Sequence, residues 1–554
     1  MANSIAQLLY PSSEHPLSSL IKYEKDITKL RSLVTKQRKR AIDEATKQNE
    51  LMNWSKRILK HGPWDPVNDP ISLDGAASLP MPVKIADPET FAPFFEHVSL
   101  NGTEEKSSST RAAEIEEPYY KVKSLEFKKG VLYSDRRMDL CKAVLGPANI
   151  GELMESLKTN SFVKHFLLGN NIIGPHGAQC IAGFLKEFPN RIETWYLAGN
   201  CIDAASFKIL VDEWVKSTSV INIWMKRNPL TPSSASDLFR LITQTANLRT
   251  LDLDQTNLGD AGVAELFMKL AQHDKPIALR HIYLNADGIG VKAATAIGQY
   301  LASPHCTLDA LYASNNPLGN DGVTALVAGL RQNSSLERLT LASAGLSDDG
   351  VIALCSALRN HPPLSALDLS QHFATQDLGF RYNWLTDRCA SAIHDLIASS
   401  TPLKYLDLGP CAITHAGLNT VLEAVIASPT LLFFAGKTIY PQDKDVVAIK
   451  ADQEHTRLHK LVRATLENNV KRVYREEMSY DDWLADEKRW LVSDKADVRK
   501  IDSVYRNRDA GLARRGIMTL EKSWDEDDAT LKEVMDGAVG PVCVKRMAKM
   551  EAAA

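Results

Sequence analysis

Residues 248–266 read LRTLDLDQTNLGDAGVAEL, and this stretch decides the fold. With Leu248 as step 1, apolar residues stand at steps 4, 6 and 11, and a small residue, Gly262, stands at step 15. Apolar residues two apart predict a short strand with one buried face. Beyond Gly262, Leu266 and Leu270 are four residues apart, which predicts a helix with one apolar stripe packed closely over that strand.

The same unit recurs along the chain with a period of roughly 28–31 residues. Its apolar trio at steps 1, 4 and 6 occurs nine times, as Val163/Phe166/Leu168, Ile192/Trp195/Leu197, Val220/Ile223/Met225, Leu248/Leu251/Leu253, Leu279/Ile282/Leu284, Leu308/Leu311/Ala313, Leu336/Leu339/Leu341, Leu364/Leu367/Leu369 and Leu403/Leu406/Leu408. Step 9 is Asn171, Asn200, Asn228 or Asn316 in four units and Thr256, Asp287, Ala344, His372 or Cys411 in the others. An Asn there can bond backbone groups that the strand has released. Because a single unit cannot bury its apolar face, the pattern predicts a stacked α/β solenoid over residues 162–440.

The consensus of these units, LxxLxLxxNxLxxxGxxxLxxxL, resembles the leucine-rich repeats of the ribonuclease-inhibitor type, which also occur in Ran GTPase activators and intracellular immune receptors. The resemblance covers about half of the chain. It implies a curved solenoid of about nine to ten repeats, with parallel strands on the concave face, helices on the convex face and partners bound mostly on the concave side. One departure is FATQDLGFRYNWLTD (373–387), an insertion that lengthens the eighth unit by about eleven residues.

The flanking segments predict four further regions. Residues 1–61 are polar and, from 17 onward, free of proline, which predicts an N-terminal helical arm. Residues 62–118 are first Pro-rich and then polar, which is typical of a linker. Residues 119–161 predict a hairpin and a first strand that cap the exposed end of the solenoid. Residues 441–554 predict a C-terminal helical region that either caps the last repeat or forms a module of its own.

Composition and charge disfavour several classes of protein. The chain has 554 residues and a formal charge of −3, which does not favour a nucleic-acid-binding protein. It has no run of about eighteen apolar residues, so no membrane span is predicted, and its start lacks the apolar core of a secretory signal. The eight cysteines show no paired metal spacing, which indicates reduced, intracellular thiols. We therefore expect a cytoplasmic location, with the nucleus as an alternative if KQRKR (36–40) is a localisation signal rather than a solvated helix face.

Residues between the buried strand positions are expected on the concave face. Equal steps of neighbouring repeats lie about 4.8 Å apart, so aromatic residues at step 5 would form two exposed pairs separated by Asp252. Basic residues stand at steps 2, 7 and 8 nearby. The predicted partner-binding residues are Tyr196, Trp224, Lys226, Arg227, Arg249, Arg280, Tyr283 and Tyr312. Aromatic and arginine side chains are enriched at binding hot spots, so the surface predicts an adaptor or scaffold whose partner is a protein of acidic and apolar character.

No catalytic residue, cofactor or metal is predicted. The chain has no P-loop, no GxSxG and no HExxH, the patterns that position phosphates, nucleophiles and catalytic zinc. His455 and His459 are four residues apart, which allows a shared metal, but this spacing alone is more typical of a solvated helix face.

Two alternative functions stay open. The resemblance to Ran activators implies GTPase activation, with Arg227 or the pair Arg136/Arg137 as the charge-stabilising arginine. Aromatic and basic residues together would also suit single-stranded RNA, although Asp252 and Asp254 would repel phosphate. The oligomeric state is not indicated by the sequence.

Overall fold

The structure, a computed structural model, describes residues 54–76, 78, 85–105, 123–372, 374–376, 378–440, 445–474 and 480–484. It divides into two compact units, Met1–Lys60 and His61–Ala554. In the first unit, residues 54–60 are described and are helical. Most of the predicted arm (1–61), including KQRKR, lies outside the described residues. Every element named below belongs to the second unit.

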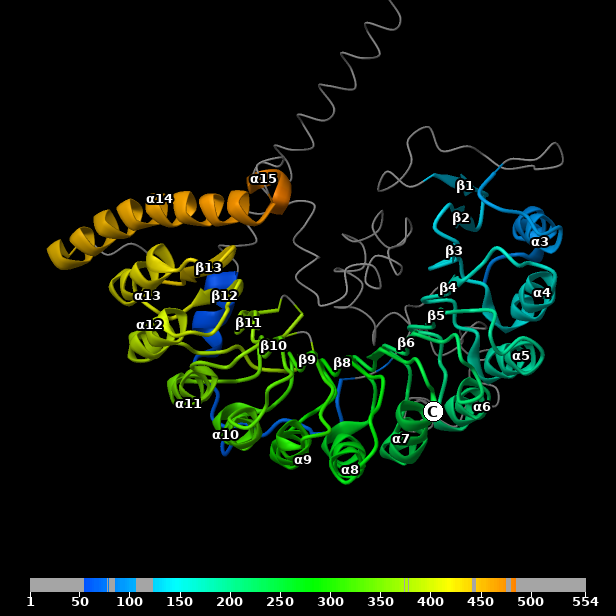
Figure 1. Cartoon of the computed structure of the whole chain (residues 1–554), viewed down its shortest axis with the longest axis horizontal. Coiled ribbons are helices and arrows are strands. Elements are labelled where there is room, and N and C mark those ends of the chain that lie inside the picture. The colour runs from blue at the N-terminus through cyan, green and yellow to red at the C-terminus, as the bar shows by residue number, and fades with distance from the viewer. Residues whose placement is uncertain are drawn as a thin grey trace, which may run out of the picture. The chain divides into compact units, whose positions relative to one another are not determined.

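A sheet of thirteen strands runs through the described part of the second unit in strand order β1 to β13 (Figure 1). The hairpin β1–β2 and the pair β2–β3 are antiparallel, and every pair from β3–β4 onward is parallel. The strands are β1 (Ser124–Glu126), β2 (Val131–Tyr133), β3 (Arg137–Asp139), β4 (His165–Leu167), β5 (Thr194–Tyr196), β6 (Asn222–Trp224), β7 (Thr250–Asp252), β8 (His281–Tyr283), β9 (Ala310–Tyr312), β10 (Arg338–Thr340), β11 (Ala366–Asp368), β12 (Tyr405–Cys411) and β13 (Phe433–Thr438).

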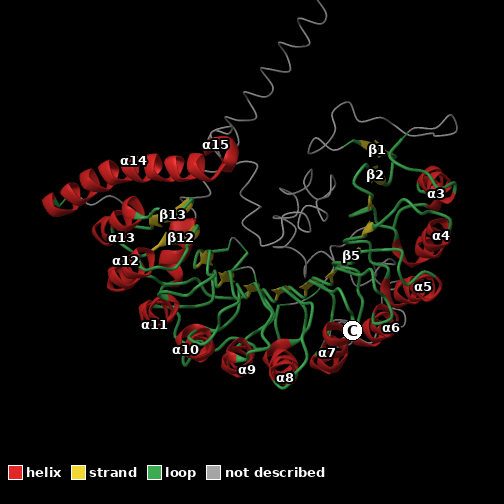
Figure 2. Ribbon diagram, in the orientation of Figure 1, coloured by secondary structure: helices red, strands yellow, loops and turns green. Residues whose placement is uncertain are grey.

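One helix follows each strand from β3 onward, so strands line the inner side of the curve and helices the outer side (Figure 2). The α-helices are α3 (Ala92–Ser99), α4 (Gly146–Lys158), α5 (Gly174–Glu187), α6 (Ala204–Trp214), α7 (Ala235–Gln244), α8 (Gly259–Ala271), α9 (Val291–Ala302), α10 (Gly319–Leu330), α11 (Asp348–Leu358), α12 (Ala390–Ala398), α13 (His415–Ala427), α14 (Val446–Tyr474) and α15 (Tyr480–Asp482). Short 3-10 helices are η1 (Pro88–Thr90), η3 (Pro232–Ser234) and η4 (Asp387–Cys389). This arrangement confirms the predicted curved α/β solenoid.

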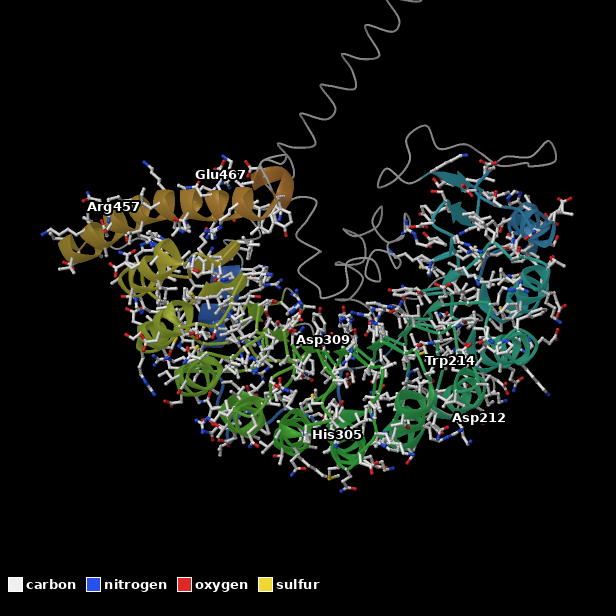
Figure 3. All side chains as sticks on the ribbon, in the orientation of Figure 1. Asp212, Trp214, His305, Asp309, Arg457 and Glu467 are labelled. Carbon is white, nitrogen blue, oxygen red and sulfur yellow. The ribbon has the colours of Figure 1, made fainter. Side chains whose placement is uncertain are left out.

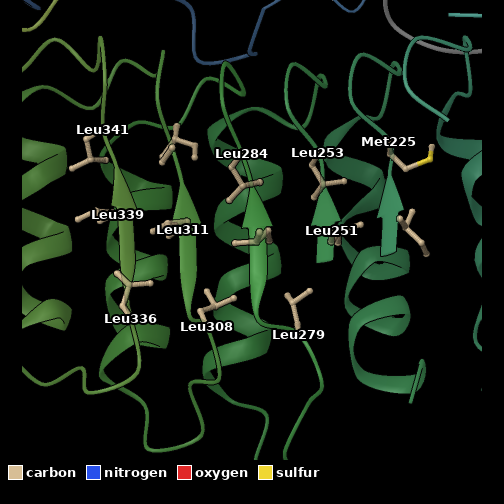
Figure 4. Packing of buried hydrophobic residues seen from close by; sticks show 14 of the residues in the cluster. Met225, Leu251, Leu253, Leu279, Leu284, Leu308, Leu311, Leu336, Leu339 and Leu341 are labelled. Atoms are coloured by element: carbon tan, nitrogen blue, oxygen red, sulfur yellow. The ribbon is translucent and has the colours of Figure 1, made fainter. Parts of the chain in front are cut away.

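The core lies between the strands and the helices, where equal repeat steps stack in register. At step 4, Leu251 pairs with Ile282, and Leu311 pairs with Leu339. All four of these side chains are fully buried. Figure 4 shows steps 1, 4 and 6 of successive repeats as three rows of apolar side chains. Because each leucine contacts the equivalent residues of both neighbouring repeats, no repeat is stable by itself.

A second ladder is polar and runs through the turn after each strand. The Asn316 amide nitrogen donates to the carbonyl oxygens of Leu284 (2.8 Å) and Ala313 (3.0 Å), while its side-chain oxygen accepts from the backbone nitrogens of Asp287 and Ile289 (both 3.0 Å). One buried side chain thus satisfies donors and acceptors of two repeats. This is the bonding expected of Asn at step 9.

In the eighth repeat the structure corrects the residue assigned to that step. Asn383, not His372, donates to the carbonyl oxygens of Leu341 and Leu369 (both 2.9 Å). Its side-chain oxygen also accepts from the backbone nitrogen of Ala344 (2.9 Å). The extra residues therefore stand at 372–382, before the turn rather than after it. They reach back along the array, where the Thr375 hydroxyl donates to the Asn315 side-chain oxygen (3.0 Å).

The described residues of the expected linker (62–118) are packed parts of the second unit. Residues 62–76, which we call the strap, run along the turns that join strands to helices. The Leu73 carbonyl accepts from the Asp260 backbone nitrogen (2.8 Å), and the Ala76 nitrogen donates to the Ala286 carbonyl (2.9 Å). Arg381 of the insertion donates to the Asp69 carboxylate (2.7 Å). Proline-rich composition here marks a packed segment with turns rather than a linker.

At the N-terminal end of the array, α3 adds one more helix beside α4. Phe91, Phe94 and Val98 are fully buried there. The Asn160 amide donates to the carbonyl oxygens of Val98 (3.1 Å) and Gly102 (3.0 Å) and so ties the end of α3 to the first repeat. Residues 85–105 are therefore part of the capped end of the solenoid.

At the C-terminal end, α14 packs against α13 and covers the last repeat. Its buried side chains include Leu458, Val462 and Leu466, which are four residues apart and form one stripe. The Asn469 amide donates to carbonyl oxygens at the end of the last repeat (2.8 and 3.0 Å). In the described residues, α14 is thus a cap. No helix in the described ranges is long and apolar enough to span a membrane.

Candidate partner-binding surface

The four predicted aromatic residues form one continuous ladder along the inner face of the strands. Ring centroids are 6.1 Å apart for Tyr196 and Trp224, 5.1 Å for Trp224 and Tyr283, and 4.0 Å for Tyr283 and Tyr312. The expectation that Asp252 separates two pairs is therefore wrong. Asp252 is only 2% exposed, and its short side chain leaves room for Trp224 and Tyr283 to meet across the intervening repeat.

The ladder is also less exposed than its sequence positions predicted. Tyr196, Trp224 and Tyr312 are 7%, 5% and 9% exposed, and Tyr283 is partly buried. Large rings on neighbouring strands, which are about 4.8 Å apart, cover one another. The alternation of side chains along a single strand predicts which face a ring is on, but not how much of it the adjacent strands cover. The ladder is consequently a rigid aromatic floor rather than a row of free side chains.

The phenols of Tyr283 and Tyr312 stay neutral at physiological pH. Tyr283 and Tyr312 stack with ring planes 3° apart. Burial, followed by the neighbouring phenol of Tyr312, raises the pKa of Tyr283 well above its usual range. Burial likewise raises the pKa of Tyr312. Both hydroxyls therefore remain able to donate a hydrogen bond.

Two of the predicted basic residues lie beside the ladder where β6 ends. The Lys226 ammonium contacts the Asp254 carboxylate at 3.0 Å, with 38% of the lysine side chain exposed. Burial opposes the charged form of Lys226, but the carboxylates of Asp254 and Asp252 raise its pKa. Arg227 adopts a left-handed backbone conformation (φ 58°), and burial lowers its pKa.

The structure separates Arg249 and Arg280 from these two residues. Together with Glu193 they line another groove, of about 650 Å³, where the chain enters the strands. The Arg280 guanidinium donates to the Thr307 carbonyl at 2.9 Å. In Figure 3, Asp309 lies on the strand side of the repeats, whereas His305 lies on the helical side. Burial raises the pKa of Asp309, while Arg280 acts in the opposite direction.

Sequence reasoning missed a second part of the surface, formed by residues at step 3. Tyr405 and Phe433 stack with centroids 4.5 Å apart and ring planes 8° apart. A cavity of about 220 Å³ lies between Tyr312 and Tyr405, with Arg338 on its wall. Step 3 shares the concave face with step 5 because side chains alternate along a strand. Reading step 3 through all repeats would have found Arg338, Tyr405 and Phe433.

The arginines considered before the first repeat have structural contacts. Arg136 donates to the carbonyl oxygens of Phe162 and Ser161, both at 2.8 Å. Arg137 is 2% exposed, and its guanidinium lies over the Tyr133 ring at 4.3 Å. The Arg136 contacts join the turn before β3 to the start of the first repeat, and Arg137 packs β3 against β2.

His455 and His459 lie at the interface between α14 and α13. The His455 Nδ1 atom is 3.0 Å from the Asn419 side-chain oxygen, and its ring stacks on His415 with centroids 4.3 Å apart. Within the described ranges no group of three or more His, Cys, Asp or Glu residues has a geometry that could hold a metal ion.

Comparison with known proteins gives matches to repeat proteins. A family model described as "Leucine Rich repeat" matches residues 246–267 and 332–355. Ribonuclease inhibitor of Sus scrofa is 26% identical over 300 residues, or 53% of this chain and 56% of the inhibitor. Ribonuclease inhibitor of Mus musculus is 26% identical over 209 residues, or 37% and 45% of the two chains. NACHT, LRR and PYD domains-containing protein 5 of Mus musculus is 25% identical over 218 residues, or 34% and 18%. The chain spans about half the length of the ribonuclease inhibitors that it matches.

Proposed function

Since the chain is a leucine-rich-repeat protein of the ribonuclease-inhibitor-like type, we propose that it is an adaptor or scaffold that binds a protein partner on the concave face of its solenoid. The observation that carries this proposal is the aromatic ladder Tyr196–Trp224–Tyr283–Tyr312, with Lys226 and Arg227 at its edge. The seven described cysteines are free thiols, as in reducing compartments. We therefore propose a cytoplasmic partner.

The rigidity of the ladder supports a binding role. Rings that already pack against one another lose little conformational freedom when a partner covers them, so less of the binding free energy is spent on ordering side chains. Aromatic floors bordered by cations are typical of interface hot spots. A partner with acidic and apolar side chains would complement both the rings and the basic edge.

The test is quantitative affinity capture from native lysate with two matched double variants. Lys226→Gln/Tyr283→Ala alters the concave surface. Lys269→Gln/Met268→Ala alters α8 on the convex side, where Lys269 is 36% exposed and ion-paired with Glu265 at 2.7 Å, much as Lys226 is with Asp254. Met268 is 39% exposed. Thermal unfolding of each variant checks that it is folded.

We expect the concave variant to lose at least one protein that wild type and the convex variant both retain. The affinity of that protein, measured with purified components, should fall by about 10-fold or more, since two hot-spot contacts of about 1 kcal/mol each are removed. Equal capture by all three baits would contradict a concave binding site.

A further inference from the structure

A cavity of about 220 Å³ interrupts the aromatic surface between Tyr312 and Tyr405. Residues of several repeats line it, among them Ser314, Arg338 and Asp368. Its volume is below the roughly 300–1,000 Å³ of pockets that hold cofactors or drug-sized molecules. The cavity therefore has room for one side chain of a partner rather than for a free metabolite.

Arg338 gives this cavity its chemistry. The residue is only 8% exposed, and its Nε atom is buried without a hydrogen-bond acceptor. Its neighbours in register on β9 and β11 are Ala310 and Ala366, too short to cover the guanidinium. Among the described residues, none accepts a hydrogen bond from Arg338 or forms an ion pair with it.

The carboxylates of Asp368 on β11 and Asp407 on β12 have other partners. The Asp368 carboxylate accepts from the Ser370 backbone nitrogen (2.9 Å) and hydroxyl (2.6 Å). The Asp407 carboxylate accepts from the Tyr405 hydroxyl (3.1 Å) and the Gly409 nitrogen (2.9 Å). A buried guanidinium without a counter-ion is destabilising. The repeat array thus maintains an unpaired cation at the wall of an open cavity.

We propose that this cavity receives one aspartate or glutamate side chain of the protein partner, held by the Arg338 guanidinium between the rings of Tyr312 and Tyr405. The inference rests on the proposed function and specifies the partner's anchor residue. A guanidinium binds a carboxylate through two parallel hydrogen bonds. The Tyr312 hydroxyl stays protonated, because burial raises the pKa of Tyr312, and can donate to the same group.

A carboxylate suits the cavity better than a phosphate. Asp368 lines the same space, and its negative charge repels a doubly charged phosphate more strongly than a singly charged carboxylate. One arginine also matches one carboxylate, whereas recognition of phosphorylated peptides generally uses clusters of arginines.

The test is an NMR titration of the full chain labelled at arginine Nε. N-acetyl-glutamate methylamide, which carries one side-chain carboxylate, is compared with N-acetyl-glutamine methylamide, which has nearly the same shape without charge. The resonance that disappears in Arg338→Lys identifies Arg338. We expect the glutamate probe to shift that resonance saturably and the glutamine probe to leave it unchanged.

Arg240→Gln is the control, because Arg240 lies on α7 and is already ion-paired with Asp212 at 2.8 Å; this variant should keep the titration of Arg338. No shift with the glutamate probe up to its solubility limit, or equal shifts with both probes, would overturn the proposal. A larger shift with inorganic phosphate would overturn the choice of carboxylate. If the glutamate probe binds but the affinity capture retains no protein on the concave face, the result would count against the proposed adaptor function and not against the carboxylate site.

A second readout needs no ligand. Arg338→Met removes the unpaired charge and keeps most of the side-chain volume, so we expect a higher unfolding temperature than that of the wild type. A lower unfolding temperature would show that Arg338 has an internal stabilising role and would contradict an unpaired, ligand-ready cation.

Discussion

At the residue scale, Asp287 shows what happens to the polar ladder when a carboxyl oxygen replaces the amide nitrogen of Asn. It stands at step 9, where Asn316 donates two hydrogen bonds to backbone carbonyls. One Asp287 oxygen accepts from the Thr256 nitrogen and hydroxyl (both 2.8 Å), but Oδ2 has no partner in the described structure. Burial raises the pKa of Asp287 well above its usual range. The carboxyl is therefore favoured in its protonated form, which can donate as Asn does.

We predict that Asp287→Asn stabilises the fold at neutral pH by about 1–2 kcal/mol, because the amide supplies the missing donor without a proton. The raised pKa means that the folded state holds a proton that the unfolded state releases above about pH 4. The contribution of Asp287 to the free energy of unfolding of the wild type is therefore largest below that pH. It declines as the pH rises toward the pKa of Asp287 in the folded state. Urea unfolding at several pH values should show the gain growing with pH. A constant or negative difference would contradict a neutral Asp287.

At the residue scale, the sequence predicted the buried strand positions well, but it predicted neither the exposure of the aromatic side chains nor the role of Asn383. The trio positions were predicted because each is fixed by its own repeat, and Leu251 and Leu339 are fully buried as expected. Trp224 was placed on the correct face, but its exposure depends on Tyr283 two repeats away. Asn383 was missed because the insertion precedes the turn, and spacing alone cannot tell on which side extra residues were added.

At the element scale, the strap depends on glycines in the turns that it crosses. Gly345 has φ 68°, and a Cβ there would collide with the Trp64 ring. Gly319 has φ 56° and also lies against this ring. Glycine is thus required at Gly345 for both its backbone conformation and the close approach of the strap.

Gly345→Ala should lower the free energy of unfolding by about 1–3 kcal/mol, through left-handed strain and displacement of Trp64. Gly379→Ala is the matched control, since Gly379 has φ 77° but nothing within 4 Å of the added methyl group. The difference between the two variants isolates the strap contact. Faster backbone hydrogen exchange around Leu73 in Gly345→Ala alone would be the expected signature. Identical effects of both variants would show that the strap does not depend on this contact.

The helix α14 gives a pH-dependent prediction. Burial, followed by the charges of His415 and His459, lowers the pKa of His455 to about 4. Asp452 acts in the opposite direction and contacts His415. A lowered pKa means that the interface is favoured above the ordinary histidine pKa of about 6.5 and weakens as pH falls toward 4.

We therefore expect backbone exchange in α14, corrected for intrinsic rates, to increase between pH 7 and pH 5 relative to exchange in α8. In His455→Gln the increase should be smaller, because the amide keeps a hydrogen-bonding group toward Asn419 without gaining a proton. The same pH dependence in the variant would assign the effect to other groups. Sequence alone left open whether 441–554 caps the array or forms a module of its own, because the choice depends on contacts with α13.

At the scale of the whole molecule, repetition made the fold predictable. The pattern occurs nine times, so the solenoid can be recognised even though single positions, such as Asp287 at step 9, depart from the consensus. The segments that occur once were not predictable in the same way. The strap, the insertion and α14 pack on surfaces created only after the repeats have stacked, which local composition does not describe. The candidate surface shares this property, because Arg338 becomes an unpaired cation only through its neighbours Ala310 and Ala366.

The measurement that tests the central claim most directly is site-specific photo-crosslinking of the full chain in native lysate. A photoreactive amino acid replaces Lys226 on the concave surface or, as the matched position, Lys269 on α8; the two side chains are 38% and 36% exposed. We predict a covalent adduct from position 226 with a protein whose capture the concave double variant loses, and no such adduct from position 269. Adducts from position 269 alone, or equal adducts from both positions, would contradict binding on the concave face.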